Sequence, residues 1–89
     1  MALEGAFDLR GLVVRALAME LKVSEAAVEG ARSLKSELKM DSIAAANVAF
    51  VVEEALGVEI EIAKDDNIDT VGAIIAVVLR STPGLQVER

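Results

Sequence analysis

Lys39-Met40-Asp41-Ser42-Ile43 is the stretch around which the chain is organised, because a helix begins within it. The run from Ile43 to Leu56 contains neither Gly nor Pro, and it predicts a helix that begins at Ser42 and ends at Gly57. A helix start presents unpaired backbone N–H groups and the positive end of the helix dipole, which favour a phosphate attached to a serine there. Ser42 is therefore a candidate site of modification.

The predicted helix carries two separate apolar faces. The face expected to pack into a core consists of Ala45, Val48, Ala49, Val52 and Leu56. Ile43, Ala46 and Phe50 recur at i, i+3 and i+7 on another face. This second face is expected to form an apolar contact surface.

An apolar pattern extends on both sides of the helix start, and a second short motif follows it. The pattern consists of Leu21, Val23, Val28, Leu34, Leu38, Asp41-Ser42-Ile43, Val48, Val52, Leu56, Val58 and Ile60. With this register, which needs no gap, the chain resembles the acyl carrier protein family, whose hallmark is an Asp-Ser-Leu-like triplet at the start of the second helix. The segment Thr70-Val71-Gly72-Ala73-Ile74 is similar to the opening of the family's last helix.

The resemblance implies a specific chemistry for Ser42. In the family, a separate phosphopantetheinyl transferase moves the 4′-phosphopantetheine of coenzyme A onto this serine hydroxyl, and acyl groups are then carried as thioesters on the terminal thiol. Asp41 would belong to the flanking motif that the transferase reads. On the residues alone, two other interpretations stay open: Ser42 is only an N-cap, and Asp41 is only a capping or solvated carboxylate.

The resemblance also implies partners, which are acyl-loading and acyl-processing enzymes such as a ketosynthase or an acyltransferase. The residues placed to meet them are Ile43, Ala46, Phe50, Glu53 and Glu54. Ala44 and Asn47 occupy positions that often carry acids in the family, and Lys39 stands where many members have Gly. We therefore expect docking through the apolar residues more than through charge near Ser42. The alternative is that Ala44 and Asn47 are ordinary exposed helix positions.

Composition limits what this chain of 89 residues can do. Its residues are 54% hydrophobic but only 2% aromatic, which favours a small helical bundle with a core of Val, Ile, Leu and Ala. The chain has no Cys and no His, so it lacks a thiolate nucleophile and the usual general base, and we do not expect an enzyme. No metal site is expected either, because the acids near the C-terminal end lack the spacing of a calcium loop.

The formal net charge of −6 argues against nucleic-acid binding, which needs clustered Lys and Arg, and it favours basic protein partners. The N-terminus has no basic region before an apolar core and does not predict a secretory signal. The longest uncharged apolar run, from Thr70 to Leu79, is about half of what a membrane span needs. We expect a cytoplasmic protein without a membrane contact.

Two further long helices are predicted around the central one. The first runs from Phe7 to Leu21, and its core face consists of Leu9, Val13, Ala16, Leu17 and Leu21. The last runs from Val71 to Arg80 after a cap by Asp69 or Thr70, and its core face consists of Val71, Ile74, Ile75 and Val78. A monomer is expected, although the uncharged outer face of the last helix leaves room for a contact through Ala73, Ala76 and Val77.

The connections are predicted to be long. Ser24 can cap a short turn through Val28, and residues 29–40 form an ordered loop with Leu34 and Leu38 as anchors. Residues 58–62 alternate with period two but have no partner strand, so they are interpreted as an extended connector whose Val58, Ile60 and Ile62 pack on the bundle. Residues 64–68 allow at most one helical turn.

The predicted fold is all-α: a small acyl-carrier-like bundle of three main helices plus a short fourth, with a long loop between the first two main helices. Residues 1–89 form a single carrier protein domain, with frayed tails at 1–5 and 82–89. The resemblance implies a stand-alone acyl carrier protein, modified at Ser42, in polyketide or specialised fatty acyl biosynthesis. The alternatives are a peptidyl or aminoacyl carrier protein, and an unmodified helical interaction module with a carrier-like fold.

Overall fold

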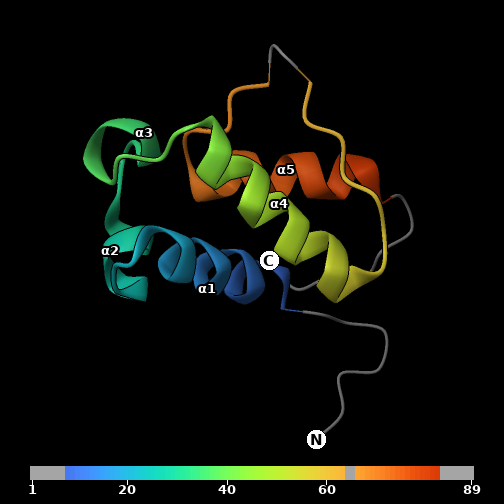
Figure 1. Cartoon of the computed structure of the whole chain (residues 1–89), viewed down its shortest axis with the longest axis horizontal. Helices are drawn as coiled ribbons and strands as arrows, with labels where there is room; N and C mark the ends of the chain where they lie inside the picture. The colour runs from blue at the N-terminus through green and yellow to red at the C-terminus, as the bar shows by residue number, and fades with distance from the viewer. Residues whose placement is uncertain (1–7, 64–65, 83–89) are drawn as a thin grey trace, which may run out of the picture.

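Three long helices and two short ones make up the part of the chain that the structure describes, residues 8–63 and 66–82 of a computed structural model (Figure 1). The helices are α1 (Leu9–Leu21), α2 (Glu25–Gly30), α3 (Leu34–Glu37), α4 (Ser42–Leu56) and α5 (Val71–Ser81). No strand occurs within these residues, and none of the described helices is long and apolar enough to cross a bilayer. The predicted all-α bundle of three main helices is confirmed.

The short helices lie within the connection between α1 and α4, where the sequence predicted mostly loop. Ser24 caps α2 as predicted, by accepting a hydrogen bond from the Ala27 N–H at 3.0 Å. A helical turn at residues 64–68 is not found: residues 66–68 are not helical, and residues 64 and 65 lie outside the described part. The reason is a local turn, in which the carboxylate of Asp66 accepts from the Ala63 N–H and the Asp66 N–H donates to the Ala63 carbonyl.

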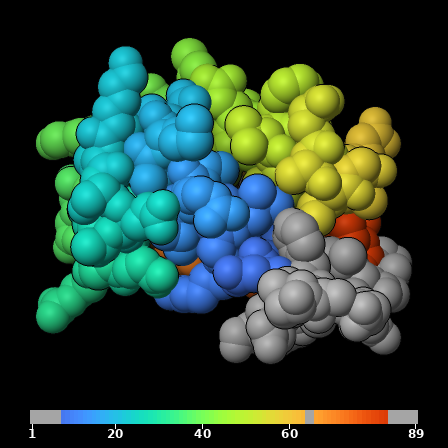
Figure 2. Space-filling view, turned by 90° about the horizontal axis from the view of Figure 1, so that it is seen from below, coloured from blue at the N-terminus to red at the C-terminus, as the bar shows by residue number. Residues whose placement is uncertain are grey.

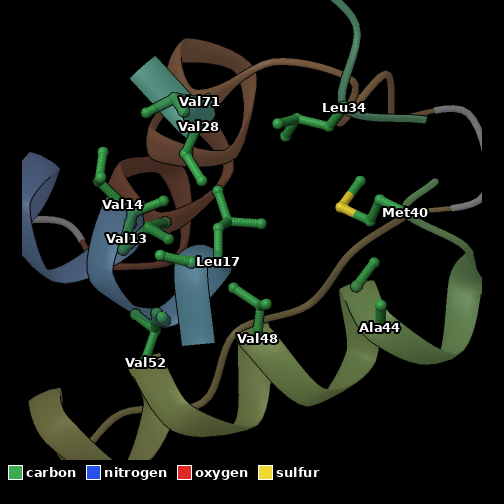
Figure 3. Close-up of a cluster of buried hydrophobic side chains, with 14 of the residues drawn as sticks. Val13, Val14, Leu17, Val28, Leu34, Met40, Ala44, Val48, Val52 and Val71 are labelled. Atoms are coloured by element: carbon green, nitrogen blue, oxygen red, sulfur yellow. The ribbon is translucent and has the colours of Figure 1, made fainter. Parts of the chain in front are cut away.

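The core is aliphatic, as predicted, and it lies where α1 packs against α4, α5 and α2 (Figure 3). The largest fully buried side chains come from all five helices. They are Leu9, Val13, Val14, Leu17, Val28, Leu34, Val48, Val52 and Val78. In Figure 1, α4 crosses in front of α5 and descends to the level of α1, which lies below α5 at the lower left. Figure 2 shows the face that α1 and α2 form, with α4 beside α1.

Capping side chains and left-handed residues set the helix ends. Asp8 accepts from the Gly11 N–H at 3.0 Å, so α1 begins two residues after the predicted start at Phe7, which lies outside the described residues. Thr70, rather than Asp69, caps α5 by accepting from the Ala73 N–H at 3.1 Å. Gly57 has a φ of 69° and ends α4 as predicted, because glycine adopts this left-handed conformation without steric cost.

Two predictions for the C-terminal part are wrong. Val77, assigned to an outer face of α5, is buried at 6% exposure, because the connector after α4 covers this side of α5 as well. Thr82, assigned to a frayed tail, is buried, and its hydroxyl donates to the Val78 carbonyl at 2.8 Å. Residues 1–5 and 83–89, the remainder of the predicted tails, lie outside the described residues.

Residues 58–62, predicted as an extended connector, belong to no helix or strand and begin the connector from α4 to α5. They bury Ile60 and half-bury Val58, whereas Ile62 is exposed. Side chains from two helices hold the connector. The carboxylate of Glu53 accepts from the Ile60 N–H at 2.8 Å, and Arg80 pairs with Asp66 at 2.7 Å and donates to the Glu61 carbonyl at 3.1 Å. The hydrogen bonds from Arg80 and from the Ala63 N–H lower the pKa of Asp66 to about 2.

Asp69 joins the end of this connector to α3. Its carboxylate accepts from the Lys35 N–H at 2.8 Å and from the Ser33 hydroxyl at 2.7 Å, and its carbonyl accepts from the Leu34 N–H at 2.8 Å. These bonds, the one from the Lys35 N–H first, lower the pKa of Asp69. A helix as short as α3 is unstable by itself in water, so its position depends on Asp69.

Asp69→Asn is expected to destabilise the fold at neutral pH and to lose this effect in acid. A carboxyl in the unfolded chain titrates near pH 4, at about 3.9, and the pKa of Asp69 is lower in the folded state. The stabilisation is therefore fully present above about pH 4 and disappears as the pH falls through the folded-state pKa. Thermal unfolding of both proteins, followed by circular dichroism from about pH 7 down to about pH 2.5, measures the difference.

Glu54→Gln is the matched control, because Glu54 is exposed and forms no hydrogen bond or ion pair with a described residue. A decrease in melting temperature that is equal for the two variants, or that is the same at every pH, would contradict the prediction.

Candidate functional site

Ser42 is the first residue of α4, and its hydroxyl is exposed to solvent. The N-cap is Asp41, whose carboxylate accepts from the Ala44 N–H at 2.8 Å. The interpretation of Ser42 as merely an N-cap is therefore wrong, and capping is performed by its neighbour. The Ser42 hydroxyl forms no hydrogen bond with any described residue, so it is accessible for reaction.

The first turn of α4 can hold an anion attached to this hydroxyl. The Ala44 N–H is bound by the Asp41 carboxylate and the Ala45 N–H by the Asp41 carbonyl, whereas the backbone N–H groups of Ser42 and Ile43 have no partner among the described residues. These two donors and the helix dipole favour negative charge at this position. A phosphate ester on Ser42 fits these surroundings.

The residues before Ser42 are held by the core. Met40 is buried, its N–H donates to the Leu34 carbonyl at 3.0 Å, and its side chain lies between Leu34 and Ala44 (Figure 3). Sequence reasoning missed Met40, because it lies in a polar segment without a periodic apolar neighbour. Lys39 has a φ of 61°, a conformation that glycine adopts more easily, which explains why Gly suits this position.

Lys39 is exposed, and no ion pair joins it to the nearby acids Glu37 and Asp41. The Glu37 carboxylate instead accepts from the Arg32 N–H at 3.0 Å. Lys39 therefore places a cation three residues before Ser42 that pairs with no acid among the residues the structure describes.

A groove of about 310 Å³ opens beside Ser42. Its lining consists of Lys35, Met40, Asp41, Ser42, Ala45, Ile62, Ala63, Asp66 and Ile68. Ala45, Ile62 and Ile68 also line an internal space of about 20 Å³ between α4, α5 and the connector. All other side chains around this internal space are Ala, Val or Ile, including Val48, Val52 and Val78. Ala45, Ile62 and Ile68 therefore form an apolar wall that faces the groove beside Ser42 on one side and the core on the other.

The outer face of α4 is apolar near Ser42, as predicted. Ile43 is 71% exposed, Phe50 is 59% exposed, and Ala46 is exposed between them. Glu54 is exposed as well, but Glu53 is half-buried and its carboxylate binds the Ile60 N–H, so it has a structural role within the protein.

The assignment of Ala44 as an exposed helix position is wrong. Ala44 is only 8% exposed, because it lies one turn before Val48 on the core face. Asn47 is exposed as expected, and its amide donates to the Glu20 carboxylate of α1 at 2.9 Å. A carboxylate at position 44 would be placed in the core. This explains why an acid is absent at one of the two positions, 44 and 47, where the family often has one.

Comparison with known proteins gives one match. A family model described as "phosphopantetheine attachment site" matches residues 11–78, a range that includes Ser42, the groove and most of α5. No curated protein and no solved structure matches the chain.

Asp41→Ala is expected to lower the free energy of unfolding by about 1 kcal/mol, because the Ala44 N–H at the start of α4 loses its acceptor. Asp41→Asn is expected to be close to the wild type, because asparagine caps helices as well as aspartate does. Urea unfolding followed by circular dichroism measures both. Equal destabilisation by the two variants would show that the charge of Asp41, and not its capping oxygen, stabilises the helix.

Proposed function

Since the chain belongs to the phosphopantetheine attachment site family, which carries a covalent 4′-phosphopantetheine group, we propose that Ser42 is the attachment residue. The observation that carries the proposal is the position of Ser42 on the first turn of α4. There an exposed hydroxyl without a hydrogen-bond partner in the described structure lies beside two unpaired backbone N–H groups. Asp41 supports this geometry by capping the same helix.

The attached group supplies a terminal thiol that carries acyl groups as thioesters, a sulfur that the chain itself lacks. The protein contributes a rigid point of attachment and a recognition surface, and its role is to carry intermediates, not to catalyse a reaction. The apolar residues Ala45, Ile62 and Ile68 beside Ser42 support an aliphatic acyl group as the cargo, because they offer hydrocarbon surface to such a chain.

The partners that fit this role are a phosphopantetheinyl transferase and acyl-loading or acyl-processing enzymes such as a ketosynthase or an acyltransferase. Ile43, Ala46 and Phe50 support docking through an apolar surface next to Ser42. Glu54 adds an exposed acid one turn after Phe50, whereas Glu53 is engaged with the connector. The buried Ala44 and the neutral Asn47 leave few charges near Ser42, which favours polyketide or specialised fatty acyl biosynthesis as the pathway.

Ser42→Ala is expected to abolish modification completely, because it removes the hydroxyl that accepts the phosphopantetheine. The wild type and the variant are incubated with coenzyme A, magnesium and a broad-specificity phosphopantetheinyl transferase, and intact-mass spectrometry reports the product. The wild type should gain one phosphopantetheine and the variant none. A modified Ser42→Ala protein, or an unmodified and folded wild type, would overturn the assignment of Ser42.

The modified wild type then distinguishes the two classes of cargo. Saturated acyl groups of increasing length should raise the melting temperature progressively, because longer chains bury more apolar area against the apolar residues beside Ser42. Aminoacyl groups should leave it unchanged. A larger rise with aminoacyl than with acyl groups would favour the peptidyl carrier instead.

Phe50→Ala is expected to reduce kcat/KM for modification by the same transferase about tenfold, because an exposed aromatic side chain on the same helix as the reacting serine, about two turns away, is a typical interface anchor. Glu54→Gln should change it by less than about twofold, because exposed ion pairs contribute little. Glu53→Gln is not used for this comparison, because it also weakens the hydrogen bond that the side chain of residue 53 accepts from the Ile60 N–H. A larger loss of kcat/KM in Glu54→Gln than in Phe50→Ala would contradict the proposal of apolar docking.

A further inference from the structure

We propose that Lys35 binds the phosphodiester of the phosphopantetheine arm, and that the groove beside Ser42 receives the part of the arm next to it. The inference rests on the proposed attachment at Ser42. It assigns a positioning role to Lys35, which belongs to α3. This short helix is joined to the attachment site by the loop of residues 38–41.

The groove contains three charged side chains, of which Lys35 is the one cation among its described lining residues. Asp66 is compensated by Arg80, whose guanidinium lies 2.7 Å from its carboxylate. Asp41 uses one carboxylate oxygen to cap α4. An anion that enters the groove from Ser42 therefore meets Lys35 as its available counter-charge.

Attachment of the arm creates the need for such a counter-charge. A phosphodiester on Ser42 adds a negative charge directly beside the Asp41 carboxylate, and two neighbouring anions repel each other. The helix dipole supplies only about half of an elementary charge at this end of α4. The ammonium group of a lysine that lines the same groove offsets the remaining negative charge.

The placement of Lys35 suits this task. Its backbone N–H is fixed by the Asp69 carboxylate at 2.8 Å, and the preceding Leu34 is fully buried, so the start of its side chain has a defined position. The side chain itself is exposed and forms no salt bridge with a described residue, although its charge helps to lower the pKa of Asp69. Met40, Ile62 and Ile68 provide apolar surface along the same groove for the hydrocarbon of the arm.

The experiment compares modified and unmodified protein, because a purely structural role of Lys35 would affect both equally. Lys35→Gln removes the cation, Lys35→Arg keeps it, and Lys39→Gln removes an exposed cation close to Ser42 that does not line the groove. Each protein is modified with the transferase, attachment at Ser42 is mapped by mass spectrometry of peptides, and melting temperatures of both forms are measured at low and high salt. Phosphorus NMR reports the surroundings of the phosphodiester directly.

We expect modification to raise the melting temperature of the wild type, of Lys35→Arg and of Lys39→Gln by roughly 2–4 °C, with a smaller increase at high salt. Lys35→Gln should lose most of this increase and shift the phosphorus resonance, while its unmodified form melts like the wild type. An equal increase in Lys35→Gln and Lys39→Gln, or no increase in the wild type, would overturn the role of Lys35 while leaving attachment at Ser42 intact. Absence of the arm from Ser42 in the wild type would overturn both proposals.

Discussion

The geometry of the site depends on the hydrogen bonds that Asp69 makes to α3 and to the residue before it. The Asp69 carboxylate binds the Ser33 hydroxyl and the Lys35 N–H, while the Asp69 carbonyl binds the Leu34 N–H. α3 consists of four residues and has no stability of its own, yet it buries Leu34, whose carbonyl binds the Met40 N–H. The position of Asp41 and Ser42 therefore follows from a contact made by the segment before α5.

The connector after α4 has a second role through this contact. It covers the apolar space beside α4 with Ile60, Ile62 and Ile68, and it is held to the bundle by polar contacts from Glu53 and Arg80. The same segment thus closes the core on one side and fixes α3 on the other. One segment with two structural roles suits a small domain, in which few residues are available for each role.

Local pattern was enough to predict the features that depend on neighbouring residues. The limits of α4, its buried face and the exposure of Ile43 and Phe50 follow from periodicity, a capping side chain and Gly57. The contacts of Asp69 could not be predicted in this way, because its partners Ser33 and Lys35 lie 36 and 34 residues away in the sequence. Ala44 shares a face with Val48 and Val52 by the same periodicity, so its burial could have been predicted from the pattern. The burial of Met40 and Val77 depends on how separate elements meet, and the role of Glu53 depends on the path of the connector.

The separation of faces on α4 has a consequence for how such a protein diversifies. Ile43, Ala46 and Phe50 bury little within the domain, while Ala44, Val48 and Val52 on the opposite side are packed into the core. Substitutions of exposed residues usually change stability by less than about 0.5 kcal/mol. The surface beside Ser42 can therefore change by substitution with little loss of stability, so recognition by other proteins can evolve at three exposed positions while the core face of α4 stays the same.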